Sequence, residues 1–281
     1  MAGTAAGVRI GAALALAAVL SACGGGSANK EPAFESFTAD ELYRQGELKL
    51  ESDGKPEDAL RYFQEIERLY PYTAYAKRAL IMQAFVLHKS KNYEEARAAA
   101  QRFIDFYPDD EDAAYAQYLL ALSYYDQIED VGRDQGLTFQ ALVAMRDVIE
   151  KYPDSEYAQS AILKFDLAFD HLAAKEMEIG RYYLKRKHYT AALNRFRSVV
   201  QDFQTTTHTA EALYRLVECY LALGFDAEAQ TAAAILGHNY QSSPFYQDAF
   251  NLLKGKGLSP EVKGDNWLSK IYRQMIRGEW L

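Results

Sequence analysis

Five segments of this 281-residue chain repeat one pattern, and this repetition constrains the fold more than any other feature. Each segment carries an alanine, an aromatic residue eleven positions later, and then proline or glutamine. The segments are 59–71, 96–108, 141–153, 192–204 and 229–241, so their last residues lie 37, 45, 51 and 37 positions apart. A repeat of this length holds a pair of helices, which buries its apolar side by stacking on neighbouring pairs.

The residue types within each repeat predict how the helices pack. Alanine lets two helices approach closely, aromatic side chains fill the groove between them, and proline ends the second helix. A further motif follows two of the prolines, at 72–76 and 154–158, and another marks the turn inside the repeat, at 92–96 and 188–192. Because no segment alternates β-branched with polar residues, we expect an all-α fold.

These features resemble tetratricopeptide repeats, although the usual period of that family is about 34 residues. The resemblance implies an α-solenoid of about five helix pairs over residues 37–253, in place of the two compact domains that the length alone suggests. The spacing of 45 residues between the ends of the second and third segments predicts a loop inserted at about 126–136. The spacing of 51 residues between the ends of the third and fourth segments predicts one long helix shared by two repeats. Within residues 155–187 only Gly180 could interrupt such a helix.

The N-terminus has the form of a secretory signal. Arg9 precedes an apolar run at 10–20, which is too short for a membrane span of about twenty residues. The run ends in Leu20-Ser21-Ala22-Cys23. This tetrapeptide resembles a bacterial lipobox and implies that Cys23 receives an S-diacylglycerol and, after cleavage, an N-acyl group. The alternative is an ordinary signal peptide that happens to end near a cysteine.

Lipidation would anchor the chain without a transmembrane helix, because two or three acyl chains together hold a protein stably on a membrane. We therefore expect residues 1–22 to be a lipoprotein signal peptide. Residues 23–36 are expected to form a lipidated, flexible tether of small and polar residues. Gly24 after the cysteine resembles the bacterial sorting signal for the outer membrane.

The composition offers little for catalysis or for binding nucleic acid. The chain has 31 Lys and Arg against 39 Asp and Glu. The resulting net charge of −8 argues against the basic face that a nucleic-acid binder needs. The five histidines are not at metal-ligand spacing, and the sequence has no Gly-rich phosphate loop or nucleophile elbow. We expect no enzymatic activity, no metal and no cofactor.

Two further features have ordinary structural interpretations. The acidic run 109–112 lacks the ligand spacing of a calcium loop, so we expect it to cap a helix N-terminus and to meet the helix dipole. Cys219 is flanked by apolar residues and is expected to be a packed, inert thiol. It has no disulfide partner once Cys23 is lipidated.

Residues 179–201 contain six basic residues and no acidic one. The basic residues at 185–187 are expected at a helix C-terminus, where cations are favoured, whereas those at 195 and 197 are expected early in the next helix, where the dipole disfavours them. This local charge inversion predicts a contact surface for an acidic partner. Its candidate residues are Arg181, Lys185, Arg186, Lys187, Arg195 and Arg197.

Residues 254–281 are expected to form a loop and an amphipathic C-terminal helix. Three glycines loosen the chain before apolar residues recur four positions apart within 265–276. Both tryptophans, Trp267 and Trp280, lie in this segment. Three interpretations stay open: a capping helix folded back on the last repeat, a helix that docks a partner through Trp267, and a helix lying on a membrane surface.

Several short motifs go beyond generic repeats and resemble the tetratricopeptide-repeat lipoproteins of outer-membrane β-barrel assembly. The matching segments are 68–72, 133–134, 151–157, 182–183 and 192–195. The resemblance implies a non-enzymatic scaffold that is lipid-anchored on the periplasmic face of the outer membrane. Its C-terminal repeats would bind the POTRA domains of a BamA-like barrel protein, and its N-terminal repeats would receive unfolded outer-membrane proteins.

The same resemblance assigns roles to individual residues. The partner-contacting arginine of the family falls on Arg195, where a bidentate pair with a carboxylate would anchor an interface. Tyr70 and Tyr43 are the candidates for a groove that holds an aromatic-rich substrate segment. Two other classes remain open: a periplasmic repeat protein that coordinates envelope constriction with cell-wall synthesis, and a lipoprotein cofactor that activates a cell-wall hydrolase or synthase.

Overall fold

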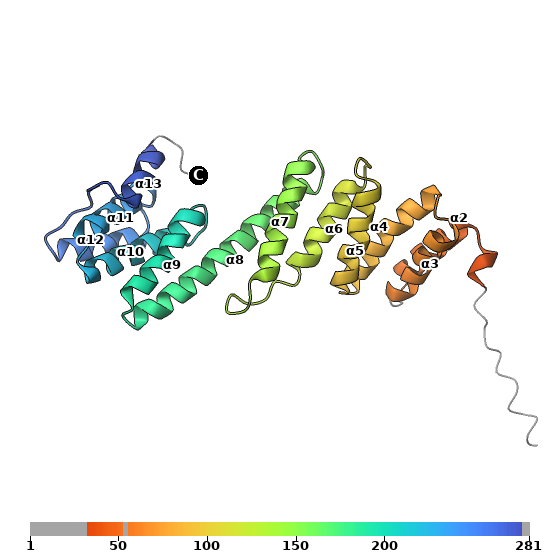
Figure 1. Ribbon diagram of the computed structural model, residues 1–281, viewed down its shortest axis with the longest axis horizontal. Helices are drawn as coiled ribbons and strands as arrows, with labels where there is room; N and C mark the ends of the chain where they lie inside the picture. Colours follow the sequence, from red (N-terminus) through yellow and green to blue (C-terminus); the bar gives the residue numbers. More distant parts are fainter. Residues whose placement is uncertain (1–32, 53–55, 277–281) are drawn as a thin grey trace, which may run out of the picture.

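The computed structural model describes residues 33–52 and 56–276, and within these ranges the chain is helical without a strand (Figure 1). A short 3-10 helix, η1 (Phe34–Ser36), precedes twelve α-helices in the described part. They are α2 (Ala39–Glu51), α3 (Pro56–Leu69), α4 (Ala74–Lys89), α5 (Tyr93–Phe106), α6 (Ala113–Tyr125), α7 (Gly136–Lys151), α8 (Ala158–Lys185), α9 (Tyr189–Asp202), α10 (Thr209–Leu223), α11 (Asp226–Asn239), α12 (Pro244–Lys254) and α13 (Trp267–Ile276). The all-α prediction is confirmed. The signal peptide expected at 1–22, Cys23 and Trp280 lie outside the described residues.

Consecutive helices pair into five repeats, as the sequence predicts. The pairs are α2–α3, α4–α5, α6–α7, α8–α9 and α10–α11, and they stack side by side into an elongated solenoid (Figure 1). In four of the pairs the second helix ends at an aromatic C-cap residue: Tyr107, Tyr152, Phe203 and Tyr240. The aromatic residues that define the repeat in the sequence therefore mark the ends of these helices.

Local signals position the helix starts and the turns. At the start of α2, Thr38 Oγ1 accepts a hydrogen bond from the backbone N of Glu41 at 3.4 Å, and the Glu41 carboxylate accepts one from the backbone N of Thr38 at 2.8 Å. Such a capping box stabilises a helix by about 1 kcal/mol. The turns after α4 and α8 share one geometry, in which Lys91 and Lys187 both have a φ of 63°. A side chain in this left-handed region costs about 1 kcal/mol.

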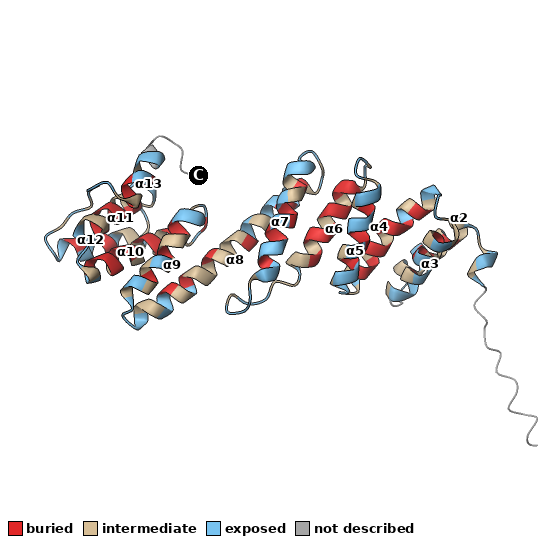
Figure 2. Cartoon of the chain, viewed as in Figure 1, coloured by how far each residue is buried: buried red, intermediate tan, exposed pale blue. Residues whose placement is uncertain are grey.

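The apolar core has an N-terminal and a C-terminal part, and α8 contributes to both (Figure 2). Phe63 and Phe103 are fully buried in the first repeats, and Phe196 is fully buried in the last two. The 28-residue α8 places Ala161 in the first part and Met177 in the second, which confirms the long helix shared by two repeats. Among the described helices, none is both long enough and apolar enough to cross a membrane.

The third repeat contains the predicted insertion. Residues 126–135 connect α6 to α7 without forming a helix or strand. Lys175 Nζ of α8 donates a hydrogen bond to the carbonyl O of Gly132 at 2.9 Å. This contact ties the loop to the middle of α8, so the extra residues of the third repeat reach the element that joins the two parts of the core.

The acidic run 109–112 caps α6 only in part, which corrects the expectation from the sequence. Asp112 stands at the N-cap position but makes no side-chain capping hydrogen bond. Asp110 instead accepts a hydrogen bond from the backbone N of Asp112 at 3.1 Å and pairs with Lys77 Nζ of α4. The hydrogen bond from Lys77 holds the pKa of the Asp110 carboxyl below its ordinary value. One carboxylate of the run therefore links the second and third repeats.

Cys219 is fully buried in α10, and burial raises the pKa of its thiol to about 12. A thiol with so high a pKa carries almost no nucleophilic thiolate at neutral pH, which confirms the predicted inert packing. In the part of the chain that the structure describes, no group of three or more His, Cys, Asp and Glu side chains could hold a metal ion.

Candidate partner-binding surfaces

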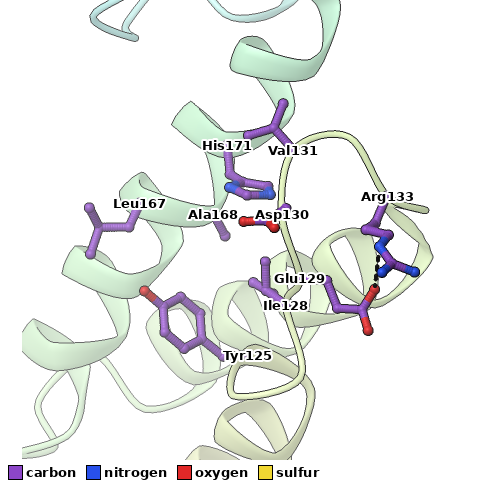
Figure 3. Close-up of a pocket in the computed structure, with 9 residues that line it drawn as sticks. All are labelled: Tyr125, Ile128, Glu129, Asp130, Val131, Arg133, Leu167, Ala168 and His171. Atoms are coloured by element: carbon purple, nitrogen blue, oxygen red, sulfur yellow. Dashed lines mark ion pairs between the residues drawn. The ribbon is translucent and has the colours of Figure 1, made fainter.

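A cleft of about 660 Å³ lies between the loop 126–135 and the middle of α8 (Figure 3). It is lined by Tyr125, Ile128, Glu129, Asp130, Val131, Arg133, Leu167, Ala168 and His171. At its rim, Arg133 Nε lies 3.7 Å from Glu129 Oε2. No serine or cysteine is among these lining residues. Sequence reasoning missed this cleft, although it found the longer spacing that supplies the loop and the motif at 133–134, whose Arg133 lines the cleft.

In the folded chain, glutamates from outside the basic segment 179–201 pair with two of its arginines. Arg181 Nη1 lies 3.0 Å from Glu211 Oε2 of α10, and Arg195 Nη1 lies 3.2 Å from Glu176 Oε2 of α8. These glutamates are 30 and 19 residues from their arginines in the sequence, so charge counting within the segment does not find them. The charge inversion that the sequence indicates is therefore smaller at the surface of the folded chain.

Arg195 keeps part of its guanidinium available. Its side chain is 43% exposed, and only Nη1 bonds to Glu176. The other guanidinium N–H groups can therefore donate to a second carboxylate. Arg195 and Arg197 lie in the middle of α9 rather than early in it. Since the helix dipole acts mainly in the first and last turns, the dipole argument drawn from the sequence for these two arginines is wrong.

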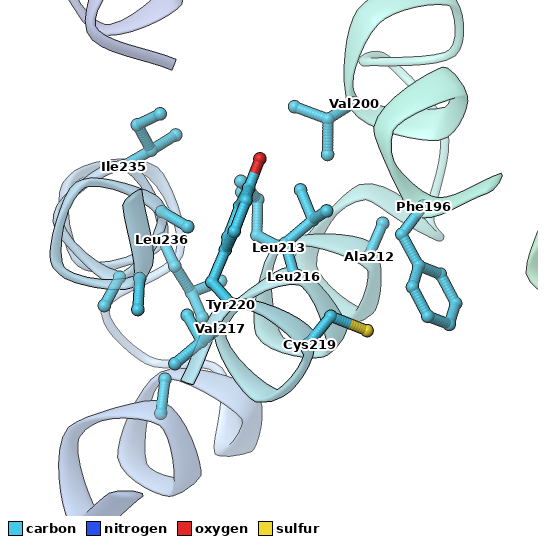
Figure 4. Packing of buried hydrophobic residues seen from close by; sticks show 14 of the residues in the cluster. Phe196, Val200, Ala212, Leu213, Leu216, Val217, Cys219, Tyr220, Ile235 and Leu236 are labelled. Atoms are coloured by element: carbon cyan, nitrogen blue, oxygen red, sulfur yellow. The ribbon is translucent and has the colours of Figure 1, made fainter. Parts of the chain in front are cut away.

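The C-terminal helix folds back onto the last repeat, as the capping interpretation predicts. Leu268 and Ile271 of α13 are buried in the C-terminal core. Trp267 Nε1 donates a hydrogen bond to Tyr220 Oη at 3.0 Å, and the Arg197 guanidinium lies 4.8 Å from the centroid of the Trp267 ring. Figure 4 shows Tyr220 among the residues of this core. Arg197 and Trp267 thus contact each other within the chain, and partner docking through Trp267 stays a prediction.

The end of α8 carries three basic residues, as predicted. The Arg186 guanidinium lies 3.7 Å from the centroid of the Tyr182 ring. Lys185 and Lys187 are exposed, and neither makes an ion pair with any residue that the structure describes. Both line a pocket of about 460 Å³, here named the lysine pocket. Its lining residues are Leu184, Lys185, Lys187, Tyr189, Glu218, Leu221, Ala222, Leu252 and Lys256.

Tyr70 and Tyr43 hold the N-terminal repeat together. Tyr70 Oη donates a hydrogen bond to the carbonyl O of Phe37 at 2.6 Å. The Tyr43 ring packs edge-on against Phe63 with 5.5 Å between the ring centroids, and burial raises the pKa of its hydroxyl. Both side chains are half-buried, whereas Tyr72 in the following turn is fully exposed. The role of Tyr70 and Tyr43 in a substrate groove stays a prediction. Tyr72 belongs to the sequence motifs at 68–72 and 72–76 but was not among the candidate site residues.

Comparison with known proteins places the chain in a family. A family model described as YfiO, outer membrane lipoprotein, matches residues 35–235, a range that extends from η1 into α11. The chain belongs to this family of outer membrane lipoproteins. It is 43% identical over 252 residues to the outer membrane protein assembly factor BamD of Caulobacter vibrioides, with 90% of this chain and 82% of that protein covered. It is 45% identical over 213 residues to BamD of Rickettsia prowazekii, covering 76% and 84%.

Two further matches have lower sequence identity. BamD of Neisseria meningitidis serogroup A is 26% identical over 249 residues, covering 84% of this chain and 93% of that protein. Among solved structures, a tetratricopeptide-repeat protein of Thermus thermophilus aligns with a TM-score of 0.36 and 20% identity, covering 75% and 98%. The resemblance to outer-membrane assembly lipoproteins is confirmed by the YfiO/BamD matches. Helices α12 and α13, which follow residue 239, lie outside the range of the family model.

Proposed function

We propose that this chain is a non-enzymatic scaffold lipoprotein of outer-membrane β-barrel assembly. The observation that carries the proposal is the 43% identity over 90% of the chain to a protein named as an outer membrane protein assembly factor. The C-terminal repeats bind the POTRA domains of a BamA-like barrel protein, and the N-terminal repeats receive unfolded outer-membrane proteins. A solenoid suits both roles, because stacked repeats present a long continuous surface for extended partners.

The scaffold is anchored through lipids on Cys23, on the periplasmic face of the outer membrane. Replacing Cys23 by alanine is expected to move the protein from the membrane fraction to the soluble periplasmic fraction, because the acyl chains are its anchor. Cell fractionation with immunoblotting measures the change. Cys219→Ala is the matched control and should leave the protein in the membrane fraction, since this thiol is buried in α10. Membrane retention of the Cys23→Ala protein would contradict the anchor.

Arg195 donates to a carboxylate of the barrel protein with the guanidinium N–H groups that Glu176 leaves free. Arg195→Glu is expected to reduce recovery of the barrel protein about tenfold or more, because a lost charge-assisted pair is replaced by repulsion. The measurement is affinity purification from gently solubilised membranes, with circular dichroism to show that helical content is unchanged. Recovery of the unaltered chain without any barrel-assembly protein would contradict the function itself.

A charge swap separates this contact from the internal ion pair. The double variant Glu176→Arg with Arg195→Glu restores a pair between α8 and α9 but leaves a glutamate at position 195. If Arg195 contacts the partner, recovery stays as low as in the single variant. A return of recovery to the level of the unaltered protein would show that Arg195 acts only through Glu176.

A further inference from the structure

The lysine pocket is lined by residues of four helices, α8, α9, α10 and α12. Leu184 and Lys185 come from the end of α8, Tyr189 from the start of α9, Leu221 from α10 and Leu252 from α12. The C-terminal ends of α8, α10 and α12 converge on it. The pocket therefore exists only because the fourth and fifth repeats stack and α12 packs against them.

The rim of this pocket is basic, and the chain does not neutralise it. Lys185 and Lys187 make no ion pair with any described residue. Lys256 Nζ reaches only a backbone carbonyl, at 3.4 Å. Glu218 is the one acid in the lining, and Arg215 Nη1 already lies 2.7 Å from its carboxylate. A chain with a net charge of −8 thus places three ammonium groups without a carboxylate partner around one concavity.

Four of the lining residues are largely apolar and are here named the floor of the pocket. It consists of Leu184, Tyr189, Leu221 and Leu252, and Leu252 is 39% exposed. Lysines near helix C-termini are ordinary, because the dipole favours cations there. The exposed apolar surface of Leu252 beside them has no such explanation, and covering it would remove apolar area from water. The volume of about 460 Å³ has room for a bulky side chain.

We propose that the lysine pocket binds an acidic segment of a partner protein, whose carboxylates pair with Lys185, Lys187 and Lys256 while one bulky apolar side chain covers the floor. Charge complementarity selects an acidic partner, and the apolar floor selects a peptide over a small inorganic anion. The proposal goes beyond the function proposed above, because it assigns a site that Arg195 does not line. The two can fail separately, since a synthetic peptide tests the pocket and recovery of the barrel protein tests the function.

The test uses the full-length lipoprotein in a non-ionic detergent and two fluorescein-labelled peptides. One peptide places phenylalanine between two runs of three glutamates, and the other has glycine in place of the phenylalanine. Fluorescence anisotropy at low salt should show that the phenylalanine peptide binds at least about threefold more tightly than the glycine peptide. Lys185→Glu with Lys187→Glu should weaken its binding about tenfold or more, and added salt should weaken binding to the unaltered protein.

The second repeat offers a matched control for the charge change. Lys89 ends α4 and Lys91 has the same φ of 63° as Lys187, so Lys89→Glu with Lys91→Glu alters net charge equally in an equivalent turn. This control should leave peptide affinity within about twofold of the unaltered protein. Equal weakening by both double variants would show a general charge effect and overturn the proposal, as would failure of the phenylalanine peptide to bind.

A second pair of variants tests the floor and does not depend on the lysines. Leu252→Ala should weaken the phenylalanine peptide about threefold to tenfold and leave the glycine peptide unchanged. Phe250→Ala is the control, since Phe250 is similarly exposed at 37% on the same helix but does not line the pocket. Equal affinity of the two peptides, or equal effects of the two alanine variants, would show that no apolar side chain enters the pocket and would overturn the proposal.

Discussion

Replacing Gly180 by alanine is expected to lower the free energy of unfolding by about 1–3 kcal/mol, although the same change inside an isolated helix is stabilising by about 0.5–1 kcal/mol. Gly180 is buried in α8 against the ring of Phe196 in α9, and a Cβ atom built on Gly180 would overlap that ring. Phe196 is itself fully buried in the C-terminal core and cannot move away without disturbing its neighbours. The overpacking therefore outweighs the gain in helix propensity.

Thermal unfolding followed by circular dichroism measures the change. Gly132→Ala is a matched control, because a Cβ at that position in the loop 126–135 would meet nothing within 4 Å. A second variant identifies the cause: adding Phe196→Leu to Gly180→Ala should cost less than the two single changes together, since the smaller side chain leaves room for the methyl group. A Gly180→Ala protein that melts above the unaltered one would contradict this account of the α8–α9 contact.

Gly180 also illustrates what the sequence could predict. The alanine, aromatic and proline positions each have a local geometric effect on a helix or its end, so their spacing predicts the five helix pairs and the long α8. The same reasoning treats Gly180 only as a potential helix breaker. Its packing against Phe196 depends on a residue in the next helix, and no local rule identifies that neighbour.

The surfaces were harder to predict, because they are made by residues far apart in the chain. In the sequence, the positive charges of the basic segment have no acidic partner nearby. In the folded chain, Glu176 of α8 and Glu211 of α10 pair with two of its arginines. The lysine pocket is lined by both Lys185 of α8 and Leu252 of α12, although three helices lie between α8 and α12 in the sequence. Charge counting along the chain finds the lysines but cannot find their apolar floor. Such features follow from how the repeats stack and not from the repeat pattern itself.

Replacing Trp267 by alanine is expected to destabilise the C-terminal core by about 2–3 kcal/mol. This loss is smaller than the one expected for a fully buried tryptophan, because the Trp267 ring is half-buried. The change removes the hydrogen bond to Tyr220 Oη and the ring below the Arg197 guanidinium. It also leaves the hydroxyl of Tyr220, a residue only 4% exposed, without that donor. Because the N-terminal repeats have their own core, the loss should be confined to α9, α10, α11 and α13.

Hydrogen–deuterium exchange read by mass spectrometry tests both the size and the location of this effect. Amides of α13 and of its neighbour α11 should lose protection, while those of α2 to α7 keep theirs. Trp267→Phe retains an aromatic ring over the core but no indole N–H, so it should recover part of the protection. A Trp267→Ala protein with unchanged exchange but reduced recovery of the barrel protein would instead show that Trp267 serves mainly as a partner contact. The packing of Leu268 and Ile271 into the C-terminal core argues for the first outcome, because a helix held by those residues is already bound to its own chain.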